Sequence, residues 1–177
     1  PFYNMPWIDF SKPEAIGCTE FCRSYLDKAI MLSDAATPLE KALIDALSLR
    51  VQKSHIVSQS EFNAWDDAYA NAMRQVNIDF PDNQIVMALC AEALMTRTPW
   101  NLWNVQTGLP TEGADTYEAI QLCEHAIRLA DQLGEEQHPA ILHLHIHLLE
   151  MSAEPERAMD SADRLFGLCP DAGHIQH

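Results

Sequence analysis

The chain has 177 residues, of which 47% are hydrophobic and 21% charged, a composition typical of one globular domain with a buried core. It carries 11 Lys and Arg against 26 Asp and Glu, and the net charge of −15 would repel phosphate backbones and anionic lipids. We therefore expect no nucleic-acid partner and no membrane partner, and no apolar run reaches the roughly 18 residues that a membrane-spanning helix needs.

Helical spacing of apolar residues predicts three helices in the first half of the chain, at about 13–33, 38–53 and 60–80. Thr37 can cap the second helix and Pro38 can begin it. The third helix places four large side chains at spacings of three and four, which indicates a buried face: Phe62, Trp65, Tyr69 and Met73.

Four more helices are predicted in the second half, over 83–96, 114–133, from Pro139 onward, and over 155–168. Strand alternation is scarce, so the sequence predicts an all-α fold. A long loop at 98–113 separates two of these helices, and a loop of this length inside a compact array is typical of a functional segment. Predicted buried positions are Ile120, Cys123, Ile127 and Ala130, then Leu144, Leu148 and Met151, then Ala158, Ala162 and Leu165.

The five cysteines include no CxxC pair, and Cys90 and Cys123 fall at helix-like positions. Such a set favours small buried hydrophobic residues in a reducing compartment over a disulfide framework. No basic segment followed by an apolar one resembles a secretory leader. We therefore expect a cytoplasmic location.

Four of the eight histidines lie within residues 138–147. On a helix, His143, His147 and Glu150 share one face, because positions i, i+4 and i+7 are neighbours there. On a strand, His143, His145 and His147 would share a face instead. Pro139 at a first helical position and acidic residues just before it favour the helix, in which His145 points away from the other two.

The predicted helices also repeat. Pro81, Pro139 and Pro170 each stand between one helix and the next, and the last two are 31 residues apart, close to the period of helix-turn-helix repeats. Stacked pairs of this kind share one elongated core and expose a concave groove. We expect residues 1–177 to form a single helical-repeat domain, and a fragment of a longer array.

Residues 138–177 resemble the signature of a tetratricopeptide-repeat-like protein family of bacteria and fungi, whose members mostly lack an assigned function. The family pattern reads HPGxLHxYIHxxExSxxPERAxxAADRLxxLxPxAGHxxH, and this chain reads HPAILHLHIHLLEMSAEPERAMDSADRLFGLCPDAGHIQH. Ala140 replaces a glycine of the pattern, and His145 stands in place of a tyrosine. Residues 3–7 and 99–103 are similar to the family's YNxPW and PWxLW. The resemblance implies antiparallel helix pairs stacked as a right-handed superhelix, an α-solenoid.

In such an array the first helices of neighbouring units lie side by side, which would bring His143 and His147 opposite His174 and His177. Imidazoles with the Glu150 carboxylate could form a site for a transition metal, Zn, Cu or Fe. Two other interpretations are a hydrogen-bonded polar network and direct binding of an acidic or peptide ligand. The H-x-x-x-H spacing lacks the adjacent Glu of the zinc-protease motif.

Four aromatic residues are candidates for contact with a ligand: Trp100 and Trp103 at the start of the long loop, and Tyr3 and Trp7 near the N-terminus. The alternative is that they fill the core. The sequence thus predicts a binding module whose groove, lined by these residues and Glu150, holds a protein, peptide or small molecule. The alternative function is a metal-dependent enzyme or metal-binding protein, and incomplete array ends could pair two copies as a homo-oligomer.

Overall fold

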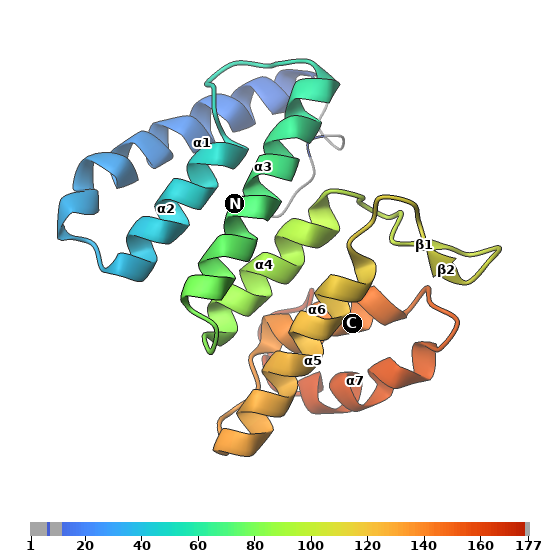
Figure 1. The fold of residues 1–177 in the computed structure, drawn as a ribbon. Coiled ribbons are helices and arrows are strands. Elements are labelled where there is room, and N and C mark those ends of the chain that lie inside the picture. Colours follow the sequence, from blue (N-terminus) through green and yellow to red (C-terminus); the bar gives the residue numbers. More distant parts are fainter. Residues whose placement is uncertain (1–6, 8–11, 176–177) are drawn as a thin grey trace. The chain divides into compact units, whose positions relative to one another are not determined.

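The computed structural model describes residue 7 and residues 12–175, and the chain divides into two compact units, Pro1–Phe80 and Pro81–His177. Seven α-helices account for most of the described residues, and the only strands there are two short ones (Figure 1). The prediction of a mainly helical fold is therefore confirmed for the described residues. None of the helices in the described part combines the length and the apolar character needed to cross a bilayer.

Unit 1 consists of α1 (Lys12–Leu32), a 3-10 turn η2 (Ser33–Ala35), α2 (Pro38–Arg50) and α3 (Gln59–Asp79). Thr37 caps α2 as predicted, because its side chain accepts from the Glu40 amide while the Glu40 carboxylate accepts from the Thr37 amide. The Ser58 hydroxyl caps α3 by accepting a hydrogen bond from the Glu61 amide, without the reciprocal bond. Helix α2 packs along α3, and the predicted positions of all three helices hold to within three residues.

The core of unit 1 is aromatic. Trp7 stacks on Phe62 with ring centroids 4.7 Å apart and meets Trp65 edge-on at 6.1 Å. Tyr69 and Met73 continue the buried face of α3. The predicted apolar face of this helix is therefore confirmed at all four positions.

A buried ion pair, which the sequence did not suggest, lies beside these rings. The Arg50 guanidinium is 3.3 Å from the Asp66 carboxylate and lies over the rings of Trp7 and Tyr69, 5.9 and 5.8 Å from their centroids. Burial raises the pKa of Asp66 to about 6, although Arg50 acts in the opposite direction. Arg50 is also where α2 ends, three residues before the predicted end.

Unit 2 contains α4 (Gln84–Thr96), a hairpin of β1 (Trp103–Asn104) and β2 (Leu109–Pro110), α5 (Thr116–Leu133), α6 (Pro139–Leu149), η3 (Pro155–Ala158) and α7 (Met159–Leu165). Helix α5 packs against both α4 and α6, and α7 covers α6 (Figure 1). Gly134 ends α5 at φ 65°, a left-handed conformation that glycine adopts without a steric penalty, and this lets the chain reverse into α6.

The loop at 98–113 carries the hairpin, which was not predicted. Trp103 pairs with Pro110 and Asn104 with Leu109. The indole N–H of Trp103 donates to the carbonyl oxygen of Leu148 at 2.6 Å. This bond fastens the hairpin to the last turn of α6.

The buried face of α6 differs from the predicted one. Ile141, His145 and Leu148 point into the core, whereas Leu144 is half-buried and Met151 is exposed. The helix turns Met151 outward because it already ends at Leu149. In the neighbouring helices, predicted core positions that are buried are Ile120, Cys123, Ala130, Ala158 and Leu165, while Ile127 and Ala162 are half-buried.

The helix expected to follow Pro170 is absent from the described residues. Residues 169–175 form consecutive turns instead, in which the Ala172 amide donates to Cys169 and the Ile175 amide donates to Ala172. Hydrogen bonds between residues three apart close turns and not α-helical rings, and Gly173 is a poor helix former. His174 therefore lies in a turn, contrary to the prediction.

Candidate functional site

A histidine cluster forms where α6 passes the turns after α7. We use this name for His143, His147 and His174. The His143 and His147 rings meet edge-on with centroids 4.5 Å apart, and the His143 and His174 rings lie 4.9 Å apart. The helical interpretation of residues 138–147 is thus confirmed, and the strand interpretation is wrong, because His143 and His147 are neighbours one turn apart on α6.

Glu150 lies at the edge of this cluster. Its Oε1 is 2.7 Å from Nδ1 of His147, and both side chains are partly open to solvent, at 51% and 37% exposure. A carboxylate on one ring nitrogen fixes the orientation of an imidazole and leaves the other nitrogen, Nε2, facing away from it. The structure therefore places Glu150 as a neighbour of His147 and not at the centre of the cluster.

The spacing of the rings suits a metal ion, but their orientation does not. Two imidazoles on one tetrahedral ion, with metal–nitrogen bonds of about 2.0 Å, have ring centres about 5 Å apart. The spacings in the cluster are of this size. As packed, however, no three His, Cys, Asp or Glu side chains in the described part of the chain have donor atoms gathered around one point. The rings are near enough for a site, and their edge-on orientation must change to form one.

Two residues predicted for the site, His177 and Tyr3, lie outside the described residues. His177 was placed beside His174 in the prediction, and Tyr3 beside Trp7.

The remaining aromatic candidates divide into buried and exposed residues. Trp7 and Trp103 are both core residues, 6% and 9% exposed, and Trp103 also packs edge-on against Tyr117 at 5.9 Å. Their burial favours the packing interpretation over ligand contact. Trp100 is different, because it is 76% exposed and has φ 53°, a backbone conformation that non-glycine residues rarely adopt.

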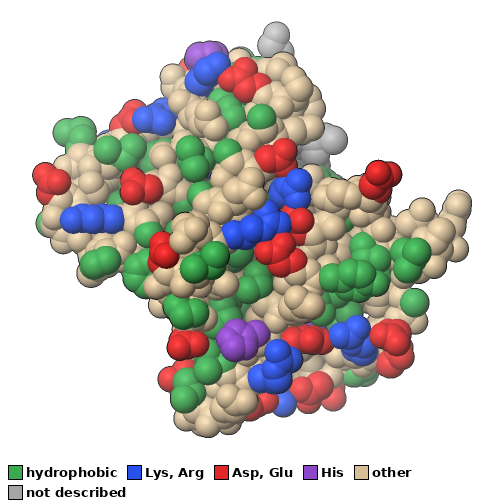
Figure 2. Space-filling view, in the orientation of Figure 1, with side chains coloured by type: hydrophobic (Ala, Val, Ile, Leu, Met, Phe, Trp, Pro, Cys, Tyr) green, Lys and Arg blue, Asp and Glu red, His purple; other side chains and the backbone are tan. Residues whose placement is uncertain are grey.

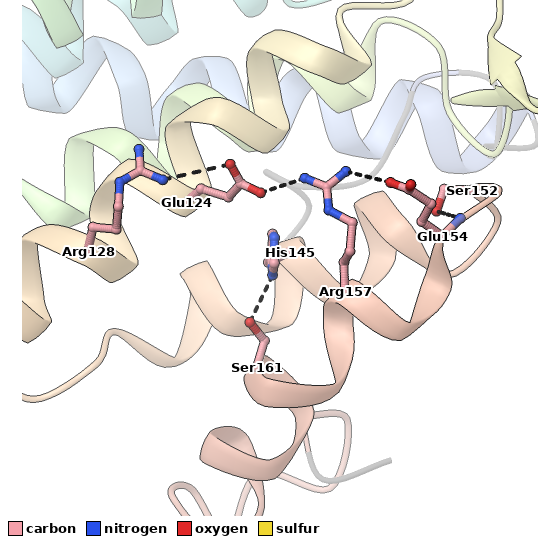
Figure 3. A network of polar contacts seen from close by, with 7 residues as sticks. All are labelled: Glu124, Arg128, His145, Ser152, Glu154, Arg157 and Ser161. Atoms are coloured by element: carbon pink, nitrogen blue, oxygen red, sulfur yellow. Dashed lines mark hydrogen bonds and ion pairs between the residues drawn. The ribbon is translucent and has the colours of Figure 1, made fainter.

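The opposite face of α6 carries His145, which the helical interpretation turned away from His143 and His147. Its side chain is buried, and its Nδ1 is 2.8 Å from the Ser161 hydroxyl of α7. On the other side of the ring, Arg157 joins Glu124 at 2.6 Å and Glu154 at 3.3 Å (Figure 3). Burial lowers the pKa of His145 and so favours its neutral form.

This network ties α5, α6 and the η3–α7 segment together behind the histidine cluster. The sequence gives little sign of this network, because charges spaced three or four apart on one helix usually pair locally. Ion pairs between distant segments, such as Arg157 with Glu124 and Arg164 with Asp131 at 2.7 Å, form only when the η3–α7 segment packs near α5.

Comparison with known proteins adds no relative: no family model, no curated protein and no solved structure matches this chain.

Proposed function

We propose that this chain is a helical-repeat binding module of the tetratricopeptide-like kind, and that it binds a transition-metal ion through the histidine cluster. The observation that carries the proposal is the meeting of three imidazole rings, from α6 and from the turns after α7, at centroid distances of 4.5 and 4.9 Å. His143 and His147 are neighbours on one helix, whereas His174 comes from a separate segment and reaches them only through the fold.

Histidine suits this role chemically. Neutral imidazole is a good ligand for zinc, copper and iron, and the Glu150 carboxylate on Nδ1 of His147 resembles the outer-shell partner that orients a metal-binding histidine. Rotation of the His143 and His174 rings about their terminal torsions, which are soft, would bring one nitrogen of each toward Nε2 of His147. A bound ion with an open coordination position would supply Lewis-acid chemistry.

The experiment is calorimetric titration of untagged protein with Zn²⁺ and with Cu²⁺. We expect one ion per chain, with Cu²⁺ the tighter, as the general order of divalent affinities requires. His143→Ala, His147→Ala and His174→Ala should each weaken binding at least about tenfold, and Glu150→Gln by about tenfold through loss of orientation. His125→Ala removes an exposed imidazole of α5 and is the matched control. The proposal would be contradicted if His125→Ala lost as much metal affinity as the other variants, or if no ion bound stoichiometrically.

A second candidate is binding of a protein partner by the hairpin. Apolar side chains gather on the surface over β1 and β2 (Figure 2), among them Val105 and Leu109, 65% and 60% exposed. Trp100, at the base of this loop, is also exposed and has a left-handed backbone conformation. The partner to test first is a second copy of the chain. Sedimentation velocity should show self-association that Trp100→Ser abolishes, and a concentration-independent monomer would remove this candidate.

A further inference from the structure

A cavity of about 380 Å³ opens where the first turns of α4 and α6 approach the turn after α7. The cavity lies within unit 2, and its volume is in the lower part of the range of small-molecule sites. Its walls come from three segments of the chain: Gln84, Glu136, Gln137, His138, Pro139, Leu168 and Cys169.

Three buried polar atoms in these walls have no hydrogen-bond partner within the described chain. They are Oε1 of Gln84, Oε1 of Gln137 and Nδ1 of His138. Buried polar atoms are nearly always paired, and each unpaired one is destabilising. Three of them beside a single cavity could be satisfied by groups from outside the chain, either water or a ligand.

Their other contacts establish which end of each glutamine amide is the oxygen. The Gln137 Nε2 donates to the Ile127 carbonyl at 3.2 Å and to the Asp131 carboxylate at 2.8 Å, and neither of these groups can donate in return. The Gln84 Nε2 donates to the Glu135 carboxylate at 3.3 Å. Exchanging oxygen for nitrogen in either amide would break these bonds, so the unpaired atoms are acceptors.

The charge around the cavity favours a cation. Glu136 contributes an exposed carboxylate, and none of the described residues that line the cavity is Lys or Arg. Burial lowers the pKa of His138, so its imidazole stays neutral and does not repel a positive charge. The walls thus offer oxygen and nitrogen acceptors together with one negative group.

We propose that this cavity binds a small organic ammonium ion, whose N–H groups donate to the side-chain oxygens of Gln84 and Gln137. Both oxygens are buried as packed, so a ligand reaches them only when each amide turns about its broad terminal torsion and its Nε2 bonds adjust. The carboxylate of Glu136 supplies the charge complement. The proposal does not depend on metal binding, because the described residues that line the cavity do not include His143, His147 or His174.

The experiment is NMR titration of the full chain with n-butylammonium, with a chelator present so that no metal takes part. Two matched probes separate the contributions of charge and of N–H donors to binding. The first, n-butanol, has the same alkyl group without the charge, and the second, tetramethylammonium, has the charge without N–H donors. We expect n-butylammonium to bind at least tenfold more tightly than either. Gln84→Met and Glu136→Gln should each weaken its binding at least fivefold, and Gln121→Met, at an exposed position of α5, should leave it unchanged.

Several results would overturn the proposal. Equal binding of n-butanol would show a merely apolar hollow, and equal binding of tetramethylammonium would show attraction to surface charge alone. Wild-type affinity in both Gln84→Met and Glu136→Gln would place the ligand elsewhere. No shift at millimolar n-butylammonium would mean that water satisfies the two side-chain oxygens. Thermal unfolding of each variant checks that the fold is kept, and the probe series on the wild-type chain decides the question even if a variant fails to fold.

Discussion

Replacing His145 tests whether the buried network holds α6 to α7. His145→Phe keeps the ring volume but removes the 2.8 Å hydrogen bond to Ser161, whose hydroxyl is then buried without this partner. This change should lower the free energy of unfolding by about 1–2 kcal/mol. His145→Ala also opens a cavity and should cost about 3–4 kcal/mol in total. Adding Ser161→Ala to His145→Phe should recover about 1 kcal/mol, because the unpaired hydroxyl is removed.

The burial of His145 also predicts that the free energy of unfolding depends on pH. Burial is the main cause that lowers the pKa of His145 in the folded chain, and the opposing effects of nearby Glu124 and Asp160 do not outweigh burial and Arg157. The unfolded chain therefore binds this proton more readily. The stability contributed by neutral His145 is complete above the unfolded pKa of about 6.5 and is lost as the pH falls below it toward the folded pKa.

Urea unfolding between pH 5 and pH 8, followed by circular dichroism, measures both effects. The wild-type chain should lose stability below about pH 6.5 more steeply than His145→Phe does. His125→Ala, at an exposed position of α5, is the control and should keep the wild-type slope. If His145→Phe and the wild-type chain show the same slope and the same midpoint at pH 8, the network does not hold these helices together and the reasoning fails.

Three further substitutions test other parts of the fold. Trp103→Phe removes the indole donor that fastens the hairpin to α6 and should cost about 2 kcal/mol by thermal unfolding; an unchanged melting temperature would mean that the bond contributes nothing. Asp66→Ala leaves the Arg50 guanidinium buried without its carboxylate and should cost about 3 kcal/mol in urea, whereas a neutral result would place Arg50 in solvent. Because the pKa of Asp66 is raised to about 6, the stability that protonated Asp66 adds is complete below the unfolded pKa of about 3.9 and is lost as the pH rises through 6; the ion pair with Arg50 is what remains above that pH. An NMR titration of the carboxyl group measures this pKa. Gly134→Ala forces a side chain into a left-handed cap and should cost about 1 kcal/mol, whereas Gly17→Ala within α1, where an added Cβ meets open space, should stabilise by about as much; equal effects at both sites would refute the conformational argument.

The helices were predictable because their signals are local. Thr37 followed by Pro38 marks the start of α2 whatever the rest of the chain does, since the capping contacts lie within one turn. The pairing of His143 with His147 follows from helical geometry in the same way. These features needed no knowledge of which helices pack together.

What the sequence could not supply depends on contacts between distant segments. Trp103 looks the same in sequence whether it faces a ligand or the carbonyl of Leu148, 45 positions away. The Arg50–Asp66 pair joins two helices, and charged residues in helical sequences usually lie in solvent. The hairpin strands are two residues each, too short for an alternating pattern to show. The position of His174 beside His143 was predicted, but from a helix that the described chain does not form.

Each unit contains a buried thiol whose rate of alkylation measures how often that unit opens. Cys18 in unit 1 and Cys123 in unit 2 are almost fully buried, and burial is the main cause that raises the pKa of each to about 12. An alkylating reagent needs an accessible thiolate, so neither sulfur can react until the helices around it open. In one sample under native conditions, the masses of two labelled peptides would therefore report how often each half of the chain opens, independently of the other.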